Sequence, residues 1–214
     1  MNRLAYSFFR QLEKRILYLP LGSVVTIADF TDIAGAKTVS KMLTRLAEEG
    51  LVRRVMRSVF WKPDGEHSEP EPNEVAKALA RENGWELAPS KETALHLFGM
   101  VDAKPKVWTY VTNGTYRNYQ YGDQQISFTH TGKRFWSKWS EKTILLIQCL
   151  KAYGKEHVTD EIRRKLGGKI HGWDTKKLVE ETKGAAVWIR DTVRVLCSKS
   201  RPVSVKRIHT EDVR

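Results

Sequence analysis

The sequence of 214 residues is poor in cysteine and has no long apolar run. Its two cysteines, Cys149 and Cys197, each lie in an apolar stretch with helical spacing, which predicts buried free thiols and suits a reducing cytoplasm. The longest uncharged apolar run, residues 144–150, is far too short to span a bilayer. Charges interrupt the first 14 residues too often for the apolar part of a signal peptide. We therefore expect a cytoplasmic protein with no membrane partner.

The sequence also lacks the residue patterns of common catalytic and metal sites. Its six histidines are scattered, with no cysteine or carboxylate at metal-ligand spacing, and neither Cys-x-x-Cys nor His-Glu-x-x-His occurs. The stretch Gly167-Gly168-Lys169 lacks the upstream glycine and the following serine or threonine of a phosphate-binding loop, so we expect a loop between helices there. Serine and threonine nucleophiles are not excluded, but nothing in the sequence activates one. These absences favour a protein that is not an enzyme and has no catalytic residue, metal site or cofactor.

Acidic residues are outnumbered, 25 against 37 basic ones, which gives a formal net charge of +12. Residues 1–62 carry 11 basic and 5 acidic side chains, residues 63–132 carry 6 and 10, and residues 133–214 carry 20 and 10. A basic excess of this size favours an anionic partner such as DNA, RNA or an acidic protein. The polar, Pro-rich and acidic stretch PDGEHSEPEPN begins at Pro63, so we predict a domain boundary near that residue.

Residues 21–62 carry the most specific pattern in the chain. A short helical pattern at residues 26–33 is followed by the tight turn Ala34-Gly35-Ala36. A second amphipathic helix then runs from about Lys37 to Glu49 and stops at Gly50, a residue type that commonly ends helices. The strand-like run LVRRVMRSVFW follows, with arginines among apolar residues. This order of helix, turn, helix and basic hairpin predicts a winged helix-turn-helix, which places its second helix in the major groove of double-stranded DNA.

The second helix of this pattern has two faces with different chemistry. One face is apolar and carries Val39, Met42, Leu43 and Leu46. The other face carries the residues that we expect to contact DNA bases and nearby phosphates, namely Lys37, Thr38, Lys41 and Arg45. In the hairpin, the residues expected to contact the DNA backbone are Arg53, Arg54 and Arg57. An ordinary solvated helix face and arginines that merely flank a hairpin are the alternatives.

Helical spacing also predicts elements on both sides of this motif. The expected helices cover residues 2–19, 73–83, 90–98, 140–153, 159–166, 174–183 and 185–197. Ser90 and Ser140 are candidate N-caps of two of these helices, because a serine hydroxyl can accept a free backbone N–H of the first turn.

The stretch KVWTYVTNGTYRNYQYGDQQISFTH predicts a β-meander between these helices. Asn113-Gly114 is a strong signal for a tight turn, and Gly122-Asp123 is a weaker one. The aromatic residues of the expected sheet are Trp108, Tyr110, Tyr116, Tyr119 and Tyr121. They could form a platform that stacks RNA bases, but the local charge is negative, which favours a core or a partner-facing sheet.

Three blocks of the sequence resemble the AbiEi-type antitoxins, the antitoxin and autoregulator half of bacterial abortive-infection (type IV) toxin–antitoxin pairs. The blocks are GSVVTIADF with KTVSKMLTRLAEEGLVRRV, then APSKETALHLFGM, and then VWTYVTNGTYRNYQYGDQQISF, while the late VWIRDTV helix is a weaker fourth. Members of that family often carry an Arg-Gly-x-Tyr wing, whereas this chain reads Arg57-Ser58-Val59-Phe60. Since glycine permits a tight backbone turn, the shape of the wing tip is left open.

The resemblance implies a transcriptional repressor and antitoxin that takes part in phage defence. Its winged helix would bind inverted repeats in the promoter of its own operon, and its C-terminal domain would counteract a nucleotidyltransferase-like toxin. A stand-alone regulator whose C-terminal domain is a protein-interaction module, and an enzyme that modifies a toxin, are the alternatives. Two copies on an inverted repeat and monomers that bend DNA cooperatively both fit the resemblance.

These observations together predict an α+β fold with three parts. Residues 1–63 form the winged helix-turn-helix, and residues 64–197 form a mixed α/β C-terminal domain with a small antiparallel sheet and several helices. Residues 198–214 lack periodicity and are expected to form a mobile basic tail.

Overall fold

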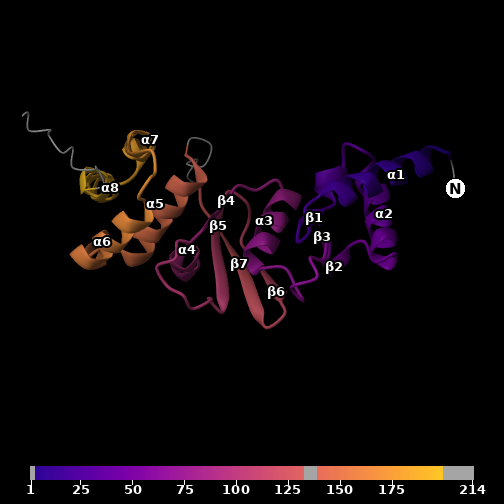
Figure 1. The fold of residues 1–214 in the computed structure, drawn as a ribbon, viewed down its shortest axis with the longest axis horizontal. Coiled ribbons are helices and arrows are strands. Elements are labelled where there is room, and N and C mark those ends of the chain that lie inside the picture. Colours follow the sequence, from indigo (N-terminus) through magenta and orange to yellow (C-terminus); the bar gives the residue numbers. More distant parts are fainter. Residues whose placement is uncertain (1–2, 133–138, 200–214) are drawn as a thin grey trace, which may run out of the picture.

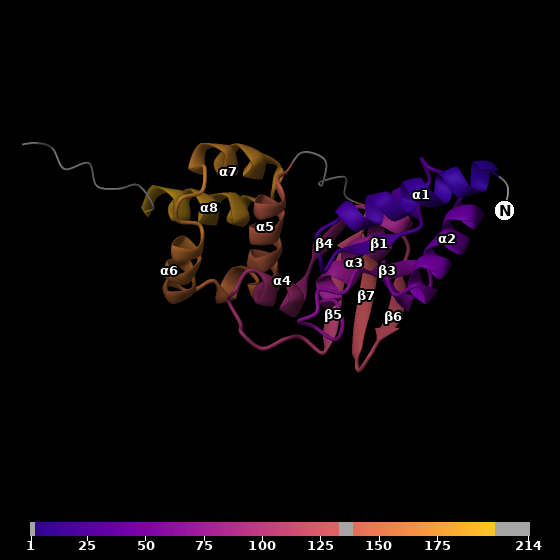
Figure 2. The same cartoon turned by 45° about the vertical axis from the view of Figure 1, so that its right-hand side comes forward.

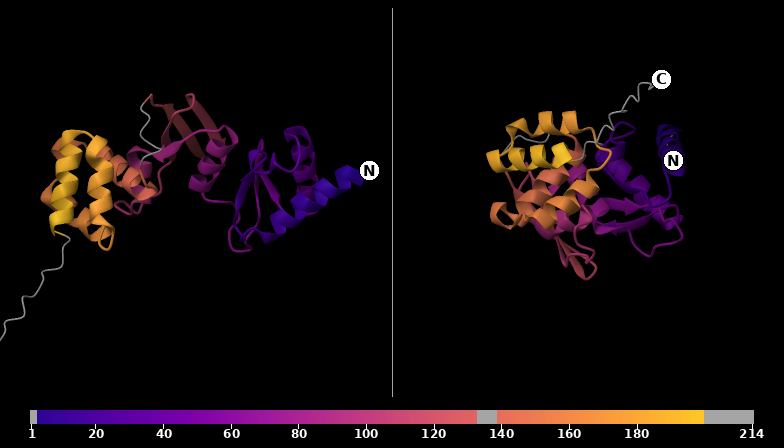
Figure 3. Two further views of the ribbon diagram at one scale, coloured as in Figure 1. Left: turned by 90° about the horizontal axis from the view of Figure 1, so that it is seen from above. Right: turned by 60° about the vertical axis from the view of Figure 1, so that its left-hand side comes forward.

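The structure is a computed structural model that describes residues 3–132 and 139–199, and its fold is α+β (Figure 1). Within these residues it contains eight α-helices, a three-stranded sheet and a four-stranded sheet. The predicted α+β class is therefore confirmed. The parts follow one another along the long axis of the molecule, with the four-stranded sheet between the first and the last helices (Figures 1 and 3).

The amino-terminal part consists of six elements around one core. They are α1 (Arg3–Tyr18), β1 (Val24–Thr26), the 3-10 helix η1 (Ala28–Phe30), α2 (Ala36–Glu48), β2 (Arg53–Met56) and β3 (Val59–Trp61). The strand order is β1-β3-β2, and both pairs are antiparallel. The core forms because both helices and one face of the sheet turn apolar side chains inward. Its buried residues are Phe9, Leu12, Ile16, Val25, Phe30, Val39, Met42, Leu43, Leu46, Val52 and Phe60.

The helix predicted at residues 26–33 is wrong. Thr26 ends β1 and pairs with Val59, and only the single turn of η1 follows. The β-branched run that forms β1 favours a strand, and the Asp29 carboxylate accepts the backbone N–H of Thr26 at 2.8 Å, which fixes the turn into η1. The second predicted helix is confirmed as α2. Gly35 is its N-cap, and Gly50 follows its end with a φ of +81°.

Lys62, the residue after β3, closes the end of α1. Its ammonium donates to the carbonyl oxygens of Ile16, Leu17 and Leu19 at 3.1, 2.8 and 2.7 Å. The last carbonyls of a helix lack intrahelical partners and carry a partial negative charge, so a lysine at this place stabilises the helix end. The contact ties α1 to the sheet.

The middle part combines the four-stranded sheet with two helices. Its elements are α3 (Pro72–Glu82), β4 (Leu87–Pro89), α4 (Lys91–Leu97), β5 (Val107–Thr112), β6 (Arg117–Tyr121) and β7 (Gln124–His130). Trp108, Tyr110 and Tyr121 are buried in its core, which favours the core interpretation of this aromatic sheet over a stacking platform. Val59 of β3 is buried in the same core, so the first sheet packs on both of its faces across the boundary predicted near residue 63.

The predicted antiparallel meander is wrong, because the strand order is β4-β5-β7-β6 and β5 runs parallel to β7. The chain at Asn113-Gly114 does not close a hairpin but passes the end of β7, where Nδ1 of His130 lies 2.6 Å from the Gly114 carbonyl oxygen. Gly114 lies against the ring of Trp85, and a Cβ at this position would clash with it. Close packing therefore explains this glycine. The weaker signal, Gly122-Asp123, joins β6 and β7 in the true hairpin.

Ser90 takes the N-cap position of α4 as predicted, but its hydroxyl caps no backbone N–H. Its backbone binds β5 instead. The N–H of Ser90 donates to the Thr109 carbonyl at 2.9 Å, and the Thr109 hydroxyl donates to the Ser90 carbonyl at 2.8 Å. The start of α4 is thus fixed by the sheet.

The carboxyl-terminal part is a bundle of helices. It comprises α5 (Glu141–Tyr153), η3 (Lys155–His157), α6 (Asp160–Lys169), α7 (Thr175–Glu181), η4 (Thr182–Gly184) and α8 (Val187–Lys199). Ser140, Thr159 and Asp174 cap α5, α6 and α7, since each side chain accepts a backbone N–H of the first turn. The loop expected at residues 167–169 is wrong, because these residues continue α6 between the buried Leu166 and Ile170.

Cys149 and Cys197 are both buried and free, as predicted. Burial raises the pKa of the Cys149 thiol to about 12 and also raises the pKa of Cys197, so both thiols stay protonated at neutral pH. The helix α8 extends to Lys199, so the first two residues of the predicted tail are helical, and residues 200–214 lie outside the described residues. In the part of the chain that the structure describes, no helix is long and apolar enough to cross a membrane.

Candidate nucleic-acid interface

The helix α2 carries most of the residues predicted to contact DNA. Its apolar residues Val39, Met42, Leu43 and Leu46 are all buried in the amino-terminal core. The predicted contact residues Lys37, Thr38, Lys41 and Arg45 are all exposed. Figures 1 and 2 both place α2 at the end of the molecule opposite to helices α5–α8. The predicted burial of one face and exposure of the other are confirmed.

The amino-terminal turn of α2 is suited to an anion. Gly35 offers no side chain that could cap the first N–H groups, and Lys37 and Thr38 lie exposed in this turn. Lys41 follows one turn later on the same side. A helix N-terminus carries a partial positive charge, to which the two ammonium groups add. These three side chains can therefore reach one anionic or hydrogen-bonding surface together.

Arg45 lies nearer to the end of α2 and is held in place by two neighbours. Its guanidinium carbon is 4.4 Å from the centre of the Phe9 ring, and its Nε donates to Glu49 at 2.8 Å. The side chain is still 49% exposed. Contact with Phe9 directs Arg45 toward α1, which makes it a more restricted donor than the two lysines.

The three hairpin arginines do not share one direction. Arg54 pairs across the strands with Phe60, whose ring centre is 5.9 Å from the guanidinium carbon, and Phe60 belongs to the core shared with α2. Arg53 pairs with Trp61 at 4.8 Å on the other face of the sheet, because successive strand residues alternate. Arg57 is exposed in the turn. The structure leaves Arg54 on the α2 side and turns Arg53 toward the four-stranded sheet.

The surroundings of Tyr121 agree with this direction of Arg53. Burial raises the pKa of the Tyr121 phenol to about 12, and the positive charge of Arg53 opposes that rise. The two side chains are therefore close enough to interact electrostatically. Because Tyr121 belongs to the core of the four-stranded sheet, Arg53 is the predicted contact residue with the weakest geometric case.

Ser58, at the tip of the hairpin, adopts the backbone conformation that glycine favours. Its φ is +67°, in the left-handed region that L-residues rarely occupy. The tight turn is thus retained in spite of the serine. Together with the shift in register between Arg54 and Met56, it sets the shape of the hairpin tip beside Arg57.

A clamp between α3 and η1, formed by Arg81, Asp29 and Glu82, holds the segment before α2. The Arg81 guanidinium donates to both carboxylate oxygens of Asp29, at 3.1 and 3.3 Å, and to the Val24 carbonyl at 2.8 Å. The Glu82 carboxylate accepts the backbone N–H of Ala28 at 2.9 Å. Sequence reasoning missed this clamp because its partners are more than 50 residues apart and no motif links them.

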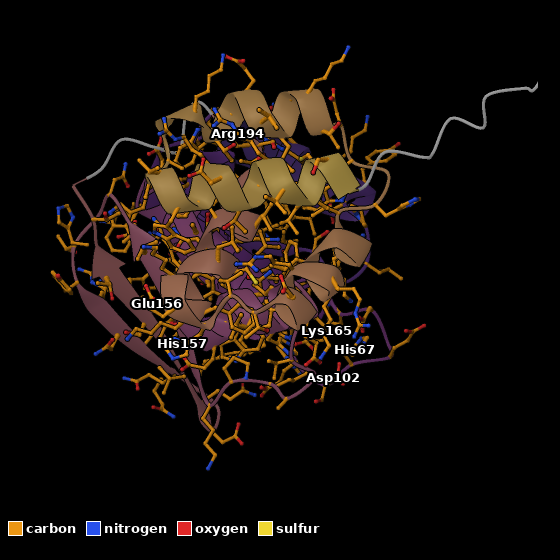
Figure 4. The ribbon with its side chains drawn as sticks, turned by 90° about the vertical axis from the view of Figure 1, so that its left-hand side faces the viewer. His67, Asp102, Glu156, His157, Lys165 and Arg194 are labelled. Atoms are coloured by element: carbon orange, nitrogen blue, oxygen red, sulfur yellow. The ribbon has the colours of Figure 1, made fainter. Side chains whose placement is uncertain are left out.

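Titratable side chains elsewhere are dispersed or explained by local structure. No group of three or more His, Cys, Asp and Glu residues that could hold a metal ion occurs among the described residues. Figure 4 shows Arg194 on α8 well apart from Glu156 and His157 of η3. Hydrogen bonds from the backbone and the ring of His67 lower the pKa of Asp64 to about 2, and the same carboxylate raises the pKa of His67. This pair belongs to an ordinary turn in the linker.

Comparison with known proteins gives one result for most of the chain. The family model described as "Family of unknown function (DUF6088)" matches residues 11–178. This range includes α2, the hairpin, the clamp and the four-stranded sheet. No curated protein matches the sequence significantly.

Proposed function

The chain belongs to the DUF6088 family, whose function is unknown, and we propose that it is a DNA-binding regulator with an amino-terminal winged helix-turn-helix. In this proposal α2 enters the major groove of double-stranded DNA, and the β2–β3 hairpin lies against the neighbouring backbone. The observation that carries the proposal is the exposed group of Lys37, Thr38 and Lys41 on a helix whose other face is buried.

The order and chemistry of the amino-terminal elements support this proposal. The single turn of η1 takes the place of the first helix of the motif. The turn at Gly35 then leads into α2, and the hairpin follows as a wing would. Lysine and threonine side chains donate hydrogen bonds to base edges and phosphates, and Arg54 and Arg57 supply donors for the backbone. The basic excess of residues 1–62 favours the approach of DNA.

The test compares DNA affinity between two matched double variants of the full chain. We expect Lys37→Ala with Lys41→Ala to weaken binding to the promoter upstream of the chain's own gene by at least about tenfold. The same variant should show a shallower dependence of affinity on salt, by about one unit of log–log slope for each phosphate that the chain no longer neutralises. Lys155→Ala with Lys165→Ala removes two exposed lysines from the far end of the molecule and should leave affinity within about twofold. Fluorescence anisotropy of a labelled duplex measures the affinity of each double variant and its dependence on salt.

Two results would speak against the proposal. Unchanged affinity of the Lys37 and Lys41 variant, with an unchanged circular dichroism spectrum, would overturn the assignment of α2. Equal binding of the promoter and a scrambled duplex by the unmodified chain would limit the function to binding without sequence specificity.

From the resemblance to the AbiEi-type antitoxins, we further propose that the chain represses its own operon and counteracts a nucleotidyltransferase-like toxin through its later part. The separate core of the carboxyl-terminal helices supports such a division, since it lies at the end of the molecule away from α2 (Figure 3). The Lys37 and Lys41 variant should then lose DNA binding but still restore growth when a neighbouring nucleotidyltransferase gene is expressed. Failure of the unmodified chain to restore growth would overturn this role.

A further inference from the structure

A groove runs between α3, the four-stranded sheet and α5, at a distance from the proposed DNA contacts. Its volume is about 480 Å³, within the range typical of small-molecule sites. The side chains that line it come from α3, the sheet, α4 and α5, and they include Lys77, Arg81, Trp85 and Ile144. The groove thus brings together residues from five elements, α3, β4, α4, β5 and α5.

One edge of the groove is a row of hydrogen-bond donors on α3. Asn73, Lys77 and Arg81 are spaced by four residues each, so they lie on one side of the helix over a length of about 12 Å. The Lys77 ammonium and the Arg81 guanidinium are about half exposed and contact Glu74 and Asp29 respectively. Each cation is paired with a carboxylate, so an anion along this edge binds by competing with Glu74 and Asp29 for these donors.

The remainder of the groove is largely apolar. Trp85 and Leu87 lie on the sheet side, and Ile144 and Leu145 of α5 line the groove with them. Glu141 is a carboxylate on this lining and disfavours an anion near α5. An occupant with its negative group toward α3 and an apolar body beyond it therefore fits this arrangement better than a fully charged molecule.

Arg81 links this groove to the segment that precedes α2. It also lines a second cavity, of about 410 Å³, together with Val24, Val25 and Asp29. Its guanidinium there donates to Asp29 and to the Val24 carbonyl. Figure 1 shows α3 between the two sheets, so one side chain contacts both the groove and the clamp. An anion that binds the Nε and Nη2 groups of Arg81 from the groove competes with Asp29 for these donors.

We propose that the groove binds a small organic anion with an apolar body, such as a carboxylate, sulfonate or phosphate ester. Binding draws the Arg81 guanidinium away from Asp29, loosens η1 and lowers the affinity of α2 for DNA. The effect on DNA rests on the function proposed above, whereas the binding site itself does not. By thermodynamic linkage, DNA lowers the affinity for the anion by the same factor.

The first experiment tests the site without DNA. Anilinonaphthalene sulfonate, an anion with an apolar aromatic body, is titrated into the full chain and followed by its fluorescence. We expect one saturable site, which Lys77→Ala and Ile144→Ser each weaken by about tenfold, because they remove a cation and an apolar contact respectively. Lys155→Ala and Tyr18→Ser are the matched controls, since they remove an exposed lysine and an exposed aromatic ring elsewhere and should change nothing.

Two outcomes of this titration would overturn the site. One is equal binding by the unmodified chain and by both groove variants, provided that their circular dichroism spectra are unchanged. The other is loss of the dye signal in Tyr18→Ser, which would place the dye on the outer face of α1.

The second experiment measures DNA affinity in the presence of saturating dye. We expect affinity for the promoter duplex to fall by about fivefold or more in the unmodified chain, and by less in Lys77→Ala. If the dye binds but DNA affinity does not change, the link through Arg81 is overturned, whereas the assignment of the groove as a binding site stands. A chain that binds the dye but no DNA would instead contradict the proposed function, so the two failures are distinguishable.

Discussion

Ser58 combines a serine side chain with a backbone conformation that suits glycine. Its φ of +67° is unfavourable for a residue with a Cβ, by about 1–2 kcal/mol relative to the right-handed region. We expect Ser58→Gly to raise the free energy of unfolding by about 0.5–1 kcal/mol, because relief of this strain exceeds the entropy that glycine adds to the unfolded chain. Ser58→Val should lower it by about 1–2 kcal/mol, since a β-branched residue fits this region least. Urea denaturation measures both changes.

A control separates the backbone effect from the removal of a hydroxyl. Ser68 is exposed in the linker and does not have a positive φ, so Ser68→Gly should be neutral or slightly destabilising. If Ser58→Gly were also destabilising, the left-handed conformation would not be a source of strain. Ser58→Gly also tests the wing, whose shape the sequence left open. Because glycine retains the tight turn, this variant should leave DNA affinity intact.

At the scale of elements, one carboxylate ties α7 to the start of α5. The Glu181 carboxylate accepts hydrogen bonds from the hydroxyls of Ser140 and Thr143, and its side chain is only 12% exposed. Burial raises its pKa, but the hydrogen bonds from Thr143 and Ser140 and the charge of Lys177 outweigh burial, so the net shift is downward. A lowered pKa means that the carboxylate form stabilises the fold above the ordinary pKa of glutamate, and that this stabilisation is lost as pH falls through the folded value.

We therefore expect Glu181→Gln to lower the free energy of unfolding by about 1–3 kcal/mol at pH 7, because an amide replaces the charged acceptor of two hydroxyls. The difference between the variant and the unmodified chain should shrink as the pH is lowered below the ordinary pKa of glutamate, since the carboxylate is then protonated. Denaturation curves across this pH range test the sign. Glu180→Gln, an exposed neighbour paired with Lys183, is the matched control and should have little effect at any pH. A difference that grows on acidification would contradict the assignment.

The sequence predicted elements well where one residue pattern decides them. The apolar spacing of α2, its end at Gly50 and the cap at Ser140 are local features, and the structure confirms them. The sheet was predicted less well, because Asn113-Gly114 has the composition of a hairpin while the packing of Trp85 on Gly114 requires a glycine for another reason. The insertion of β7 between β5 and β6 depends on contacts along the whole strand, and no local pattern encodes it.

At the scale of the whole molecule, the candidate interface also contains some residues that a local pattern predicts and others that only long-range packing explains. Lys37, Thr38 and Lys41 follow from the phase of one helix, so sequence reasoning finds them together. Arg53 and Arg54 are neighbours on β2, so their side chains lie on opposite faces of the sheet. The core shared with α2 covers one face and the core of the four-stranded sheet covers the other, and the sequence alone does not reveal this packing. The clamp of Arg81 on Asp29 lies beyond any such pattern, because it joins the amino-terminal part to the middle part across 52 residues.

This clamp predicts that residues away from α2 control DNA affinity by positioning it. We expect Arg81→Met and Asp29→Asn each to weaken promoter binding by about fivefold, and the double variant to be no weaker than either one, because both break the same contact. The slope of affinity against salt should stay as in the unmodified chain, since a positioning residue releases no counterions from DNA, whereas removal of the Lys41 ammonium should reduce it. Lys77→Ala, one turn away on α3 and outside the clamp, is the control for the helix itself and should leave DNA affinity unchanged without an added anion. Additive decreases in affinity with a reduced salt slope would instead identify Arg81 as a direct DNA contact, and α3 would then belong to the interface.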